Sequence, residues 1–559
     1  MLQLKSLRSF LRSLTPQRSG FQLDLLLCRL RGIKPRSSTK GNPLRTPILI
    51  IFDPRSKLTG YLIRIKIRRV HFFYLFLLGF YAFLLARPID LTTQDIGRHI
   101  ANGRELVAGN FSVLFKNYYS FTDPNHPFVN HHWLFGLIFF GIEQFFGFVG
   151  VHLIHILILL SAFLILLQIF KNNSSQLISF ALALPALFFL ALRSEVRPES
   201  IGFLFLVNSL WQLQKIINQQ KIAKSALILL IVQQLIWVNI HISFVFGLFT
   251  PALLWGCSVL LHSPQLKAAI NKKLLLLIVC LFFASLVNPN FIAGLLQPFQ
   301  IFTDYGYSVF ENQTLFFLWR VVKHTTLFPY SFAIIIMIAL LIAKGKVLNK
   351  FDLILCIIGM IMGYVALRNI PIFIVFTFPS MAKLLASIVQ QKNFLGHLIR
   401  IEPQQKIFIM GQLYLFIFIL TLAGVFIPYV SMNNRTIGLL PGQNHAAEFI
   451  SRNNITGPIF NNYDIGSYLI YHQPNLKVFT DNRPEAYGKQ FFQETYIPMQ
   501  LKPEIWQEQI EKQQLQTIIF GTKDITNWAQ TFLKYLKTDP SWSLIYQDSF
   551  ISIWTRHQL

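Results

Sequence analysis

The chain of 559 residues is 53% hydrophobic and 15% aromatic, and only 13% of its residues are charged. Soluble domains carry about 25% charged residues, so this composition excludes an ordinary soluble protein and indicates several membrane-spanning helices. The net charge of +26 lies mostly in an N-terminal arm and in short loops between hydrophobic segments. Positive charge in such loops orients membrane proteins. Because the loops account for much of the net charge in this way, no nucleic-acid partner is predicted.

Residues 1–69 form a basic arm. Positions 1–70 hold 16 Lys or Arg and two Asp, interspersed with Pro, Ser and Gly, so we expect a weakly structured cytoplasmic segment. The arm either contacts the anionic headgroups of membrane lipids or serves as an orientation signal or flexible tail. No long apolar stretch occurs before about residue 70, so no cleavable signal peptide is visible, and the first span is expected to act as the insertion signal.

A helical membrane module is predicted over residues 70–430, with about 11 spans of the length that a bilayer requires. The distribution of Lys and Arg places the N-terminus in the cytoplasm. Because the count is odd, the C-terminal domain then lies outside, and long outer loops are expected at 88–147 and 289–325. The predicted spans are 70–87, 148–170, 177–193, 199–214, 225–239, 242–262, 273–288, 326–343, 351–367, 371–390 and 407–430.

The apolar segment 132–146 is a separate case. Counting it as a span would place the lysines that follow residue 170 on the outer side of the membrane, against the positive-inside rule. We therefore predict a helix that lies at the membrane interface, with Glu143 and Gln144 on its polar side. The outer loop 289–325 is a further candidate for a re-entrant or interfacial element.

Residues 431–559 have the composition of a soluble α/β domain, and no phosphate-binding glycine loop occurs in them. Alternating strands and helices predict a small, largely parallel sheet with an antiparallel edge. Asp464, Asp481 and Arg483 are expected near strand ends, where such domains bind ligands, or else in a salt-bridged structural turn. Strands are expected up to residue 460 and at 477–480, 517–520, 543–546 and 550–554, and helices at 443–453, 485–496, 503–514 and 524–537.

Polar residues near the hydrophobic segments gather at the predicted outer rim of the membrane. Ionisable and amide groups near lipid are costly to hold there and usually mark a functional site. Because these motifs share one side, we expect a single extracytoplasmic cleft above the helices. The motifs are Asp90–His99, Arg193–Glu199, Asn239–His241, Asn288–Asn290 and Arg368–Pro371.

Asp95 begins a segment in which apolar residues recur at helical spacing, and His99 follows one turn further on the same face. A carboxylate at this position can accept a proton from an acceptor hydroxyl or bind a divalent cation through oxygen. The alternative is a helix N-cap without chemistry. Asp90 opens the same loop directly after the first predicted span and is a second candidate.

This loop resembles the first outer loop of the C-type (GT-C) membrane glycosyltransferases, which include protein O-mannosyltransferases and lipid A aminoarabinose transferases. In that superfamily an acidic motif after the first span opens an interfacial helix and supplies the catalytic carboxylate. A second interfacial helix then leads to the second span, as 132–146 does here, and the layout matches over 70–430. The resemblance implies that Asp95 is the catalytic carboxylate, with His99 and Asp90 nearby.

The chain departs from the superfamily at one position. Many members have Asp-Glu at the acidic motif, whereas Ile96 follows Asp95 here. The departure favours a metal-independent route, as in several lipid-phosphate-sugar transferases. No metal ligands and no cofactor are predicted, and a divalent cation is an alternative that no residue pattern indicates.

A closer resemblance is to a bacterial family of polytopic membrane proteins within the same superfamily, whose reactions are largely unassigned. It implies a location in the inner (plasma) membrane of a bacterial cell. The shared pattern spans most of the chain after residue 70. It comprises Asp95–Gly103, Tyr119–Pro124, Asn130–Leu134, Arg197-Pro198, Trp237–His241 and Asn288-Pro289, followed by Phe460–Tyr463, Gly466–Leu469 and Asp481–Arg483.

Arg193, Arg197 and Arg368 are candidates to bind a phosphate, because each lies next to a span end. A guanidinium can hold a lipid phosphate bidentately and offset the charge that develops on a leaving group. Glu199 is a further candidate for substrate binding. The alternative is interfacial snorkelling of long cations, with Glu199 or Glu195 as a structural partner.

Asn239, His241 and Asn288 can form hydrogen bonds with sugar hydroxyls or with the acceptor. Equally, polar groups at helix ends satisfy freed backbone groups, and Asn288 before a proline is typical of a helix stop. His131 and His132 cannot bind one metal from a helix face, because sequence neighbours point apart. A structural role is expected for this pair.

These features predict a hexosyl- or pentosyltransferase of the membrane. It would move a sugar from a polyprenyl-phosphate-linked donor to an extracytoplasmic glycan, lipid or protein acceptor, with Asp95 as general base. One alternative is a transporter of lipid-linked saccharides, which predicts polar groups at mid-membrane depth in broken helices. The other is a catalytically inactive relative whose outer domain binds glycan or a partner protein.

Overall fold

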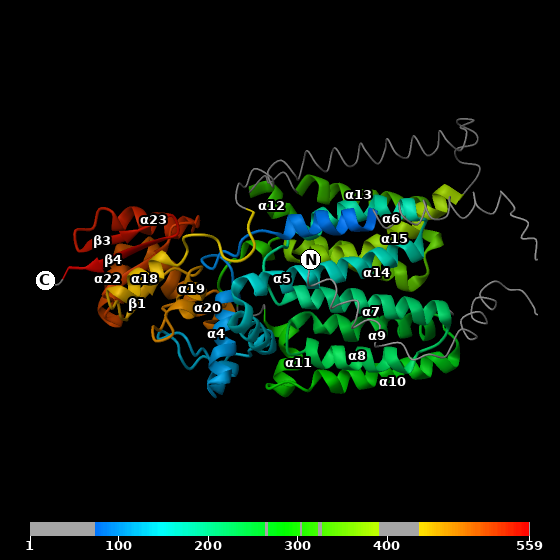
Figure 1. The fold of residues 1–559 in the computed structure, drawn as a ribbon, viewed down its shortest axis with the longest axis horizontal. Helices are drawn as coiled ribbons and strands as arrows, with labels where there is room; N and C mark the ends of the chain where they lie inside the picture. Colours follow the sequence, from blue (N-terminus) through cyan, green and yellow to red (C-terminus); the bar gives the residue numbers. More distant parts are fainter. Residues whose placement is uncertain (1–72, 263–265, 302–304, 322–326, 391–434, 558–559) are drawn as a thin grey trace, which may run out of the picture. The chain divides into compact units, whose positions relative to one another are not determined.

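The computed structural model describes residues 73–262, 266–301, 305–321, 327–390 and 435–557. The predicted arm 1–69 and the predicted span 407–430 lie outside the described residues. Figure 1 shows the described residues as a set of long helices followed along the chain by a small domain that contains a sheet.

Long apolar helices make up most of the first part of the chain. Five of the described helices are long and apolar enough to cross a membrane, and three shorter apolar helices cover Phe73–Leu85, Gln176–Ala191 and Lys224–Trp237. The chain is therefore a membrane protein. The helices are α5 (Trp133–Asn173), α6 (Gln176–Ala191), α7 (Glu199–Gln219), α8 (Lys224–Trp237), α9 (Val245–Val259), α10 (Ala268–Ser285), α13 (Leu327–Lys344), α14 (Lys350–Val365) and α15 (Ile370–Gln390).

Each predicted span within the described residues overlaps one of these helices, whereas the total of 11 is not confirmed. Several of the helices are shorter than the roughly 20 residues that an untilted span requires. Helix existence was therefore predictable, because long apolar runs leave the backbone little alternative, but the number of complete crossings was not.

Helix α5 bends at Gly147, where φ is 61° and ψ is −168°. Glycine adopts a positive φ without the steric penalty that a side chain brings. The bend separates 133–146 from 148–173, which is the boundary expected between an interfacial helix and the second span. Phe145 and Phe146 at the bend are 83% and 71% exposed, as lipid-facing residues would be. The interfacial position of 133–146 stays a prediction.

The first long loop, named the first outer loop because the charge distribution predicts that it lies outside, contains helix α4 (Ile96–Val107). This helix begins directly after Asp95, as the periodicity predicts. Its backbone packs closely on α5, because a Cβ on Gly103 would lie 2.3 Å from the carbonyl oxygen of Gly136. On another side α4 contacts α19 (Gly466–His472) of the C-terminal domain. Asp95 therefore lies where the loop meets that domain.

One buried apolar cluster joins the first outer loop to the C-terminal domain. It contains Ile96 and Ile100 of α4 together with Ile459, Tyr468 and Ile551. Full burial of one large aliphatic side chain contributes about 1.5–3 kcal/mol. Several such residues on both sides therefore hold the loop and the domain in a defined register.

The second outer loop contains α11 (Phe291–Gln300), the 3-10 helix η3 (Phe310–Asn312) and α12 (Leu315–Val321). Tyr307, just before η3, stacks on Tyr463 of the C-terminal domain with ring centroids 4.1 Å apart. Tyr307 is 7% exposed. The second loop is thus also anchored in the C-terminal domain.

The C-terminal domain has a four-stranded sheet in the order β1-β2-β4-β3. β1 pairs with β2 in parallel, whereas the β2–β4 and β3–β4 pairs are antiparallel. The expectation of a largely parallel sheet is wrong, because the final hairpin turns back and places β4 beside β2. The elements are α18 (His445–Arg452), β1 (Ile459–Asn461), α19, η7 (Pro484–Ala486), α20 (Gly488–Gln490), η8 (Phe491–Tyr496), α21 (Ile497–Leu501), α22 (Pro503–Gln513), β2 (Thr517–Gly521), α23 (Asn527–Leu536), β3 (Trp542–Gln547) and β4 (Ile551–Arg556).

The predicted strand 477–480 does not join this sheet. Its backbone instead bridges the first outer loop: the Val478 N–H donates to the Tyr119 carbonyl at 3.0 Å, and the Phe121 N–H donates to the Val478 carbonyl at 3.2 Å. The segment can be extended like a strand outside the sheet, because another extended segment satisfies its backbone groups. That partner comes from a distant part of the chain.

Candidate functional site

Asp95 is held by the C-terminal domain. It occupies the N-cap position of α4, but its side chain makes no capping hydrogen bond. Its Oδ1 instead accepts a hydrogen bond from Nδ2 of Asn482, and Oδ1 of Asn482 accepts one from Nε of Arg98 at 3.3 Å. Because Arg98 can only donate, it fixes the orientation of the Asn482 amide, with the NH₂ group toward Asp95. The capping alternative therefore has no support in this geometry.

A buried salt bridge fixes the segment that carries Asn482. Arg483 pairs with Asp481 at 2.6 Å, and these side chains are 2% and 0% exposed. Arg483 also donates to Oδ1 of Asn117 at 2.8 Å, and the Tyr487 hydroxyl donates to Asp481 at 2.9 Å. Burial raises the pKa of Asp481, but the charge of Arg483 outweighs it and holds this pKa below its ordinary value. The salt-bridged turn, and not an open ligand site, is what the structure shows here.

Asp90 is satisfied by structural partners. Its Oδ1 accepts from the Thr92 N–H at 3.0 Å and from the Thr92 hydroxyl at 2.5 Å, and also from Gln443. Its Oδ2 pairs with Nζ of Lys523 at 2.5 Å. These contacts tie the loop to the C-terminal domain and leave Asp90 poorly suited to accept a proton.

The three candidate arginines lie in one charged network. Arg193 pairs with Glu199 and, through Nη1, with Oε1 of Glu311 at 2.9 Å. Arg197 pairs with Oε2 of Glu311 at 3.0 Å and with Oε2 of Glu195 at 2.5 Å. A third arginine, Arg368, lies 3.7 Å from Oε2 of Glu199. The predicted grouping of these arginines at one place agrees with their positions in the fold.

Glu311 is a residue of this network that sequence reasoning did not select. It lies in the second outer loop, and its sequence neighbours form no motif that would mark it. Burial raises its pKa, but Arg193 and Arg197 outweigh that effect, and the pKa of Glu311 lies below its ordinary value. The group is therefore a carboxylate at neutral pH.

Asp95 lies within electrostatic range of the arginine network. Burial lowers the pKa of Arg197, whereas the negative charges of Glu311, Glu195 and Asp95 raise it, and the net result is a pKa well above the ordinary value. Burial is the main reason that the phenol pKa of Tyr305 is raised. The charge of Arg368 lowers this pKa and the charge of Asp95 raises it, so Tyr305 interacts electrostatically with both groups. The carboxylate and the arginines thus form one electrostatically connected region.

Asp464 brings a further carboxyl group to this region from the loop after β1. Burial, the negative charge of Asp524 and that of Asp95 raise the pKa of Asp464 to about 7. Near neutral pH this group is therefore divided between its acid and carboxylate forms. Strongly raised pKa values of this kind are concentrated at functional sites.

Four histidines pack together around His99 of α4 and His132 at the start of α5. The His99 ring lies 5.2 Å from that of His132, which lies 3.9 Å from His131 and 5.4 Å from His241, measured between centroids. Burial lowers the pKa of His99 well below its ordinary value and that of His131 to about 4, so these two rings are neutral. No group of three or more His, Cys, Asp or Glu side chains is placed to hold a metal ion in the described part of the chain. His99 is thus a buried neutral neighbour of Asp95.

The three amide and imidazole candidates are engaged in local structure. Asn239 accepts from the Trp133 indole at 2.8 Å and donates to the Val287 carbonyl at 2.9 Å. Nδ1 of His241 lies 2.7 Å from the Ser243 hydroxyl and accepts from the Ser243 N–H. Asn288 accepts from the Asn290 N–H at 3.0 Å and donates to the Ser285 carbonyl at 3.0 Å. These contacts correspond to the alternative in which the side chains satisfy backbone at helix ends.

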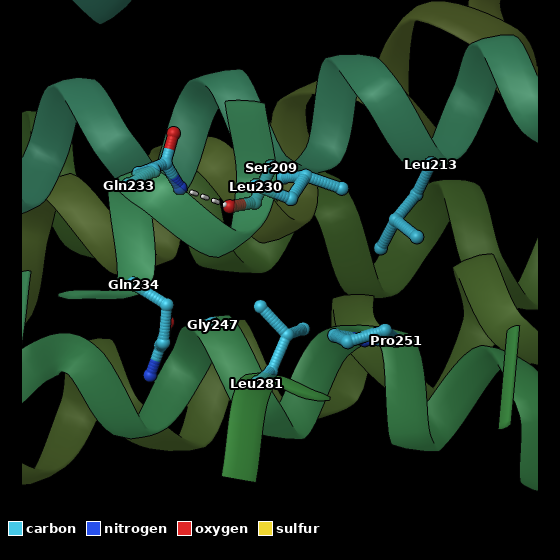
Figure 2. A pocket seen from close by; sticks show the side chains of 8 residues that line it. All are labelled: Ser209, Leu213, Leu230, Gln233, Gln234, Gly247, Pro251 and Leu281. Atoms are coloured by element: carbon cyan, nitrogen blue, oxygen red, sulfur yellow. Dashed lines mark hydrogen bonds between the residues drawn. The ribbon is translucent and has the colours of Figure 1, made fainter. Parts of the chain in front are cut away.

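A small cavity lies inside the helices, lined by residues of α7, α8, α9 and α10 (Figure 2). Gln233 donates to the Ser209 hydroxyl at 2.7 Å, and Gln234 donates to Ser285 at 2.9 Å. The space for a water-sized molecule is about 10 Å³, which suits about one water and is too small for a saccharide. The lining residues are Ser209, Leu213, Leu230, Gln233, Gln234, Gly247, Pro251 and Leu281.

The solved structures with a similar fold include oligosaccharyltransferases. AglB from Archaeoglobus fulgidus, in complex with an inhibitory peptide and a dolichol-phosphate, matches with a TM-score of 0.53 and 10% identity, over 87% of this chain and 74% of that chain. The apo oligosaccharyltransferase from the same organism matches with a TM-score of 0.52 and 10% identity, over 80% and 69%. The chain therefore shares the fold of these oligosaccharyltransferases, which agrees with the fold that the resemblance of the first outer loop implies.

No family model and no curated protein matches the chain. ArnT from Cupriavidus metallidurans, bound to undecaprenyl phosphate, has 12% identity and a TM-score of 0.40 over 89% of this chain and 98% of that chain. The narrower resemblance to one bacterial family stays a prediction. At such low identities the similarity concerns the fold, and the reaction has to be argued from the site.

Proposed function

We propose that this protein is a glycosyltransferase that moves a sugar from a polyprenyl-phosphate-linked donor to an acceptor on the outer side of a bacterial inner membrane. The observation that carries the proposal is the position of Asp95. Its carboxylate is not a helix cap, and it interacts electrostatically with Arg197. The proposed proton acceptor and one of the proposed phosphate-binding arginines therefore lie within electrostatic range of each other, in a fold that is shared with an enzyme solved with dolichol-phosphate.

Asp95 acts as the general base in this proposal. The acceptor hydroxyl gives its proton to Asp95 while its oxygen forms a bond to the anomeric carbon. The bond from that carbon to the phosphate oxygen breaks, and its electron pair leaves with the phosphate. Positioned proton transfer of this kind typically contributes about 100- to 10,000-fold in rate. Asn482 is a positioning residue, because its amide orients one oxygen of Asp95 and leaves the other for the acceptor.

Arg193, Arg197 and Arg368 bind the donor phosphate in this proposal, and Glu199 supports them. A guanidinium stabilises the charge that develops on the departing phosphate oxygen. Arg368 is held by one neutral partner, Asn312, at 3.0 Å and by the more distant Glu199, so it can turn toward a ligand at small cost. No cofactor is assigned, and the acceptor is a hydroxyl of an unidentified glycan, lipid or protein.

Glycan analysis in a deletion strain tests the activity. Envelope glycans of the deletion strain and of strains complemented with wild type or Asp95→Asn would be compared by mass spectrometry. A glycan that is lost on deletion, restored by wild type and not restored by a normally inserted Asp95→Asn protein supports the proposal. If deletion leaves every envelope glycan unchanged, the inactive-relative alternative becomes the better account.

The orientation of the chain has its own test. Alkaline phosphatase fused after residue 559 should be active, because folding of this reporter requires the outer side, and the same reporter fused at residue 60 should be inactive. The expectation rests on the distribution of positive charge in the loops. An active fusion at residue 60 would place the candidate site on the cytoplasmic side and contradict the proposal.

A further inference from the structure

One turn of helix contacts all three candidate arginines. In η3, Glu311 bridges Arg193 and Arg197 through its two carboxylate oxygens, at 2.9 and 3.0 Å. The next residue, Asn312, accepts from Nη1 of Arg368 at 3.0 Å. Two residues of the second outer loop, Glu311 and Asn312, therefore supply an oxygen to each of the three guanidiniums assigned above to the donor phosphate.

The network is electrically balanced without any substrate. It contains three arginines and three glutamates, and the side chains of Arg193, Arg197 and Glu311 are only 11%, 16% and 17% exposed. A phosphate group added to this set would leave one or two uncompensated negative charges in a poorly hydrated place. Uncompensated buried charge is strongly unfavourable. A donor phosphate can therefore enter most readily if a carboxylate leaves.

Of the three glutamates in the network, Glu311 is the one that a phosphate can most readily displace. It bridges two guanidiniums with two oxygens, which is the way that a phosphate binds two arginines. It also lies on a loop, whereas Glu199 begins helix α7. Within the described residues, the buried Nε of Arg197 has no hydrogen-bond partner. Arg197 thus keeps one unused donor for an oxyanion that has more acceptor oxygens than a carboxylate.

We propose that Glu311 occupies the phosphate subsite of the donor, and that a phosphate ester displaces this carboxylate when it binds between Arg193 and Arg197. The inference rests on the proposed function and adds that Glu311 competes with the donor phosphate for these arginines. Displacement of Glu311 changes the position of η3, and Tyr307, four residues earlier, is stacked in the C-terminal domain. Donor binding is thereby linked to the domain that also holds Asp95 through Asn482.

Binding measurements on purified full-length protein test this inference. Undecaprenyl phosphate would be titrated into nanodiscs that contain wild type, Glu311→Gln, Glu195→Gln or Arg197→Ala, and inorganic phosphate would be titrated in a second arm. If the Glu311 carboxylate leaves the phosphate subsite open in about 1–10% of the molecules, removing its charge strengthens apparent binding of the ligand by about 10- to 100-fold. Glu311→Gln should show this gain for both ligands, whereas Arg197→Ala should weaken binding about tenfold or more. Tight binding of inorganic phosphate would point to a free phosphate as the ligand, and preference for the prenyl ester would point to a lipid headgroup.

Glu195→Gln is the matched control, because Glu195 also pairs with Arg197 but is not on η3. An equal gain in Glu195→Gln would show a general charge effect and overturn the inference. Binding to Glu311→Gln that is no tighter than to wild type would also overturn it, while a dependence on Arg197 would leave the proposed function intact. If wild type and Arg197→Ala bind equally, the proposed donor site itself fails. Glu311→Asp, which keeps the charge but shortens the side chain, should show a smaller gain and replaces Glu311→Gln if that variant does not fold.

Discussion

The two charged regions of the candidate site differ in how their charges are balanced. Around Asp95, a carboxylate is held by a neutral amide, that of Asn482. Around Arg197, guanidiniums are matched by carboxylates. A carboxylate with a neutral partner can accept a proton without first breaking an ion pair, whereas paired arginines must exchange one anion for another. The first arrangement suits general-base catalysis, and the second suits binding of an anion in competition with a protein group.

Asp95→Asn should have the largest effect on activity. Asparagine keeps the shape and can accept the Asn482 hydrogen bond, but it cannot take up the acceptor proton. Loss of a general base typically lowers a rate by about 100- to 10,000-fold. Formation of the glycan identified in the deletion strain would be measured in isolated membranes, with membrane levels as the control. Full activity in this variant would remove Asp95 from the mechanism.

Arg483→Ala should have the largest effect on stability. It leaves the carboxylate of Asp481 buried without its partner, and breaking a fully buried pair costs about 3–5 kcal/mol. Thermal unfolding in detergent should show a lowered Tm, and glycan formation should fall because the segment with Asn482 is no longer held. Adding Asp481→Asn should restore part of the stability. An unchanged Tm for Arg483→Ala would contradict the role of this salt bridge.

Asp464→Asn should raise stability at high pH. The pKa of Asp464 is about 7 in the folded protein and 3.8 ordinarily, so between these values the folded state binds more protons. The contribution of this group is therefore present at low pH and is lost as the pH rises through about 7. The Tm of Asp464→Asn should exceed that of wild type at pH 8 by more than at pH 5. Glu504→Gln, on the exposed surface of α22, serves as the control, and equal differences at both pH values would contradict the prediction.

Asp90→Asn should have the smallest effect. Lys523, its charged partner, is 44% exposed, and ion pairs at the surface contribute about 0–1 kcal/mol. Activity should stay within a few-fold of wild type, and the Tm should fall slightly. If this variant instead loses activity to the extent expected of Asp95→Asn, the roles of the two carboxylates are reversed.

The sequence allowed several features of the site to be predicted, for physical reasons that act locally. The helix after Asp95 follows from apolar residues at helical spacing. The separation of 132–146 from the second span follows from the charge of the short loops beside the spans, and α5 bends at that boundary, at Gly147. Each of these arguments uses neighbouring residues alone.

Other features depend on partners that are distant in the chain. Glu311 belongs to no motif in the sequence, and the motif Asp481–Arg483 does not show which residue Asn482 contacts. Their contacts to Arg197 and Asp95 join positions 114 and 387 residues apart. The misassigned strand 477–480 has the same origin, because its partner lies in the first outer loop. Propensity cannot identify which distant backbone satisfies a strand-like segment.

Taken by itself, the sequence determined that the chain enters a membrane and where its apolar helices lie, because hydrophobicity and charge act on each segment separately. Only the tertiary structure decided which charges are balanced within the protein and which carboxylate is left with a neutral partner. The reason is that a pKa and a binding role depend on burial and on nearby charges, and at Asp95 those come from the C-terminal domain.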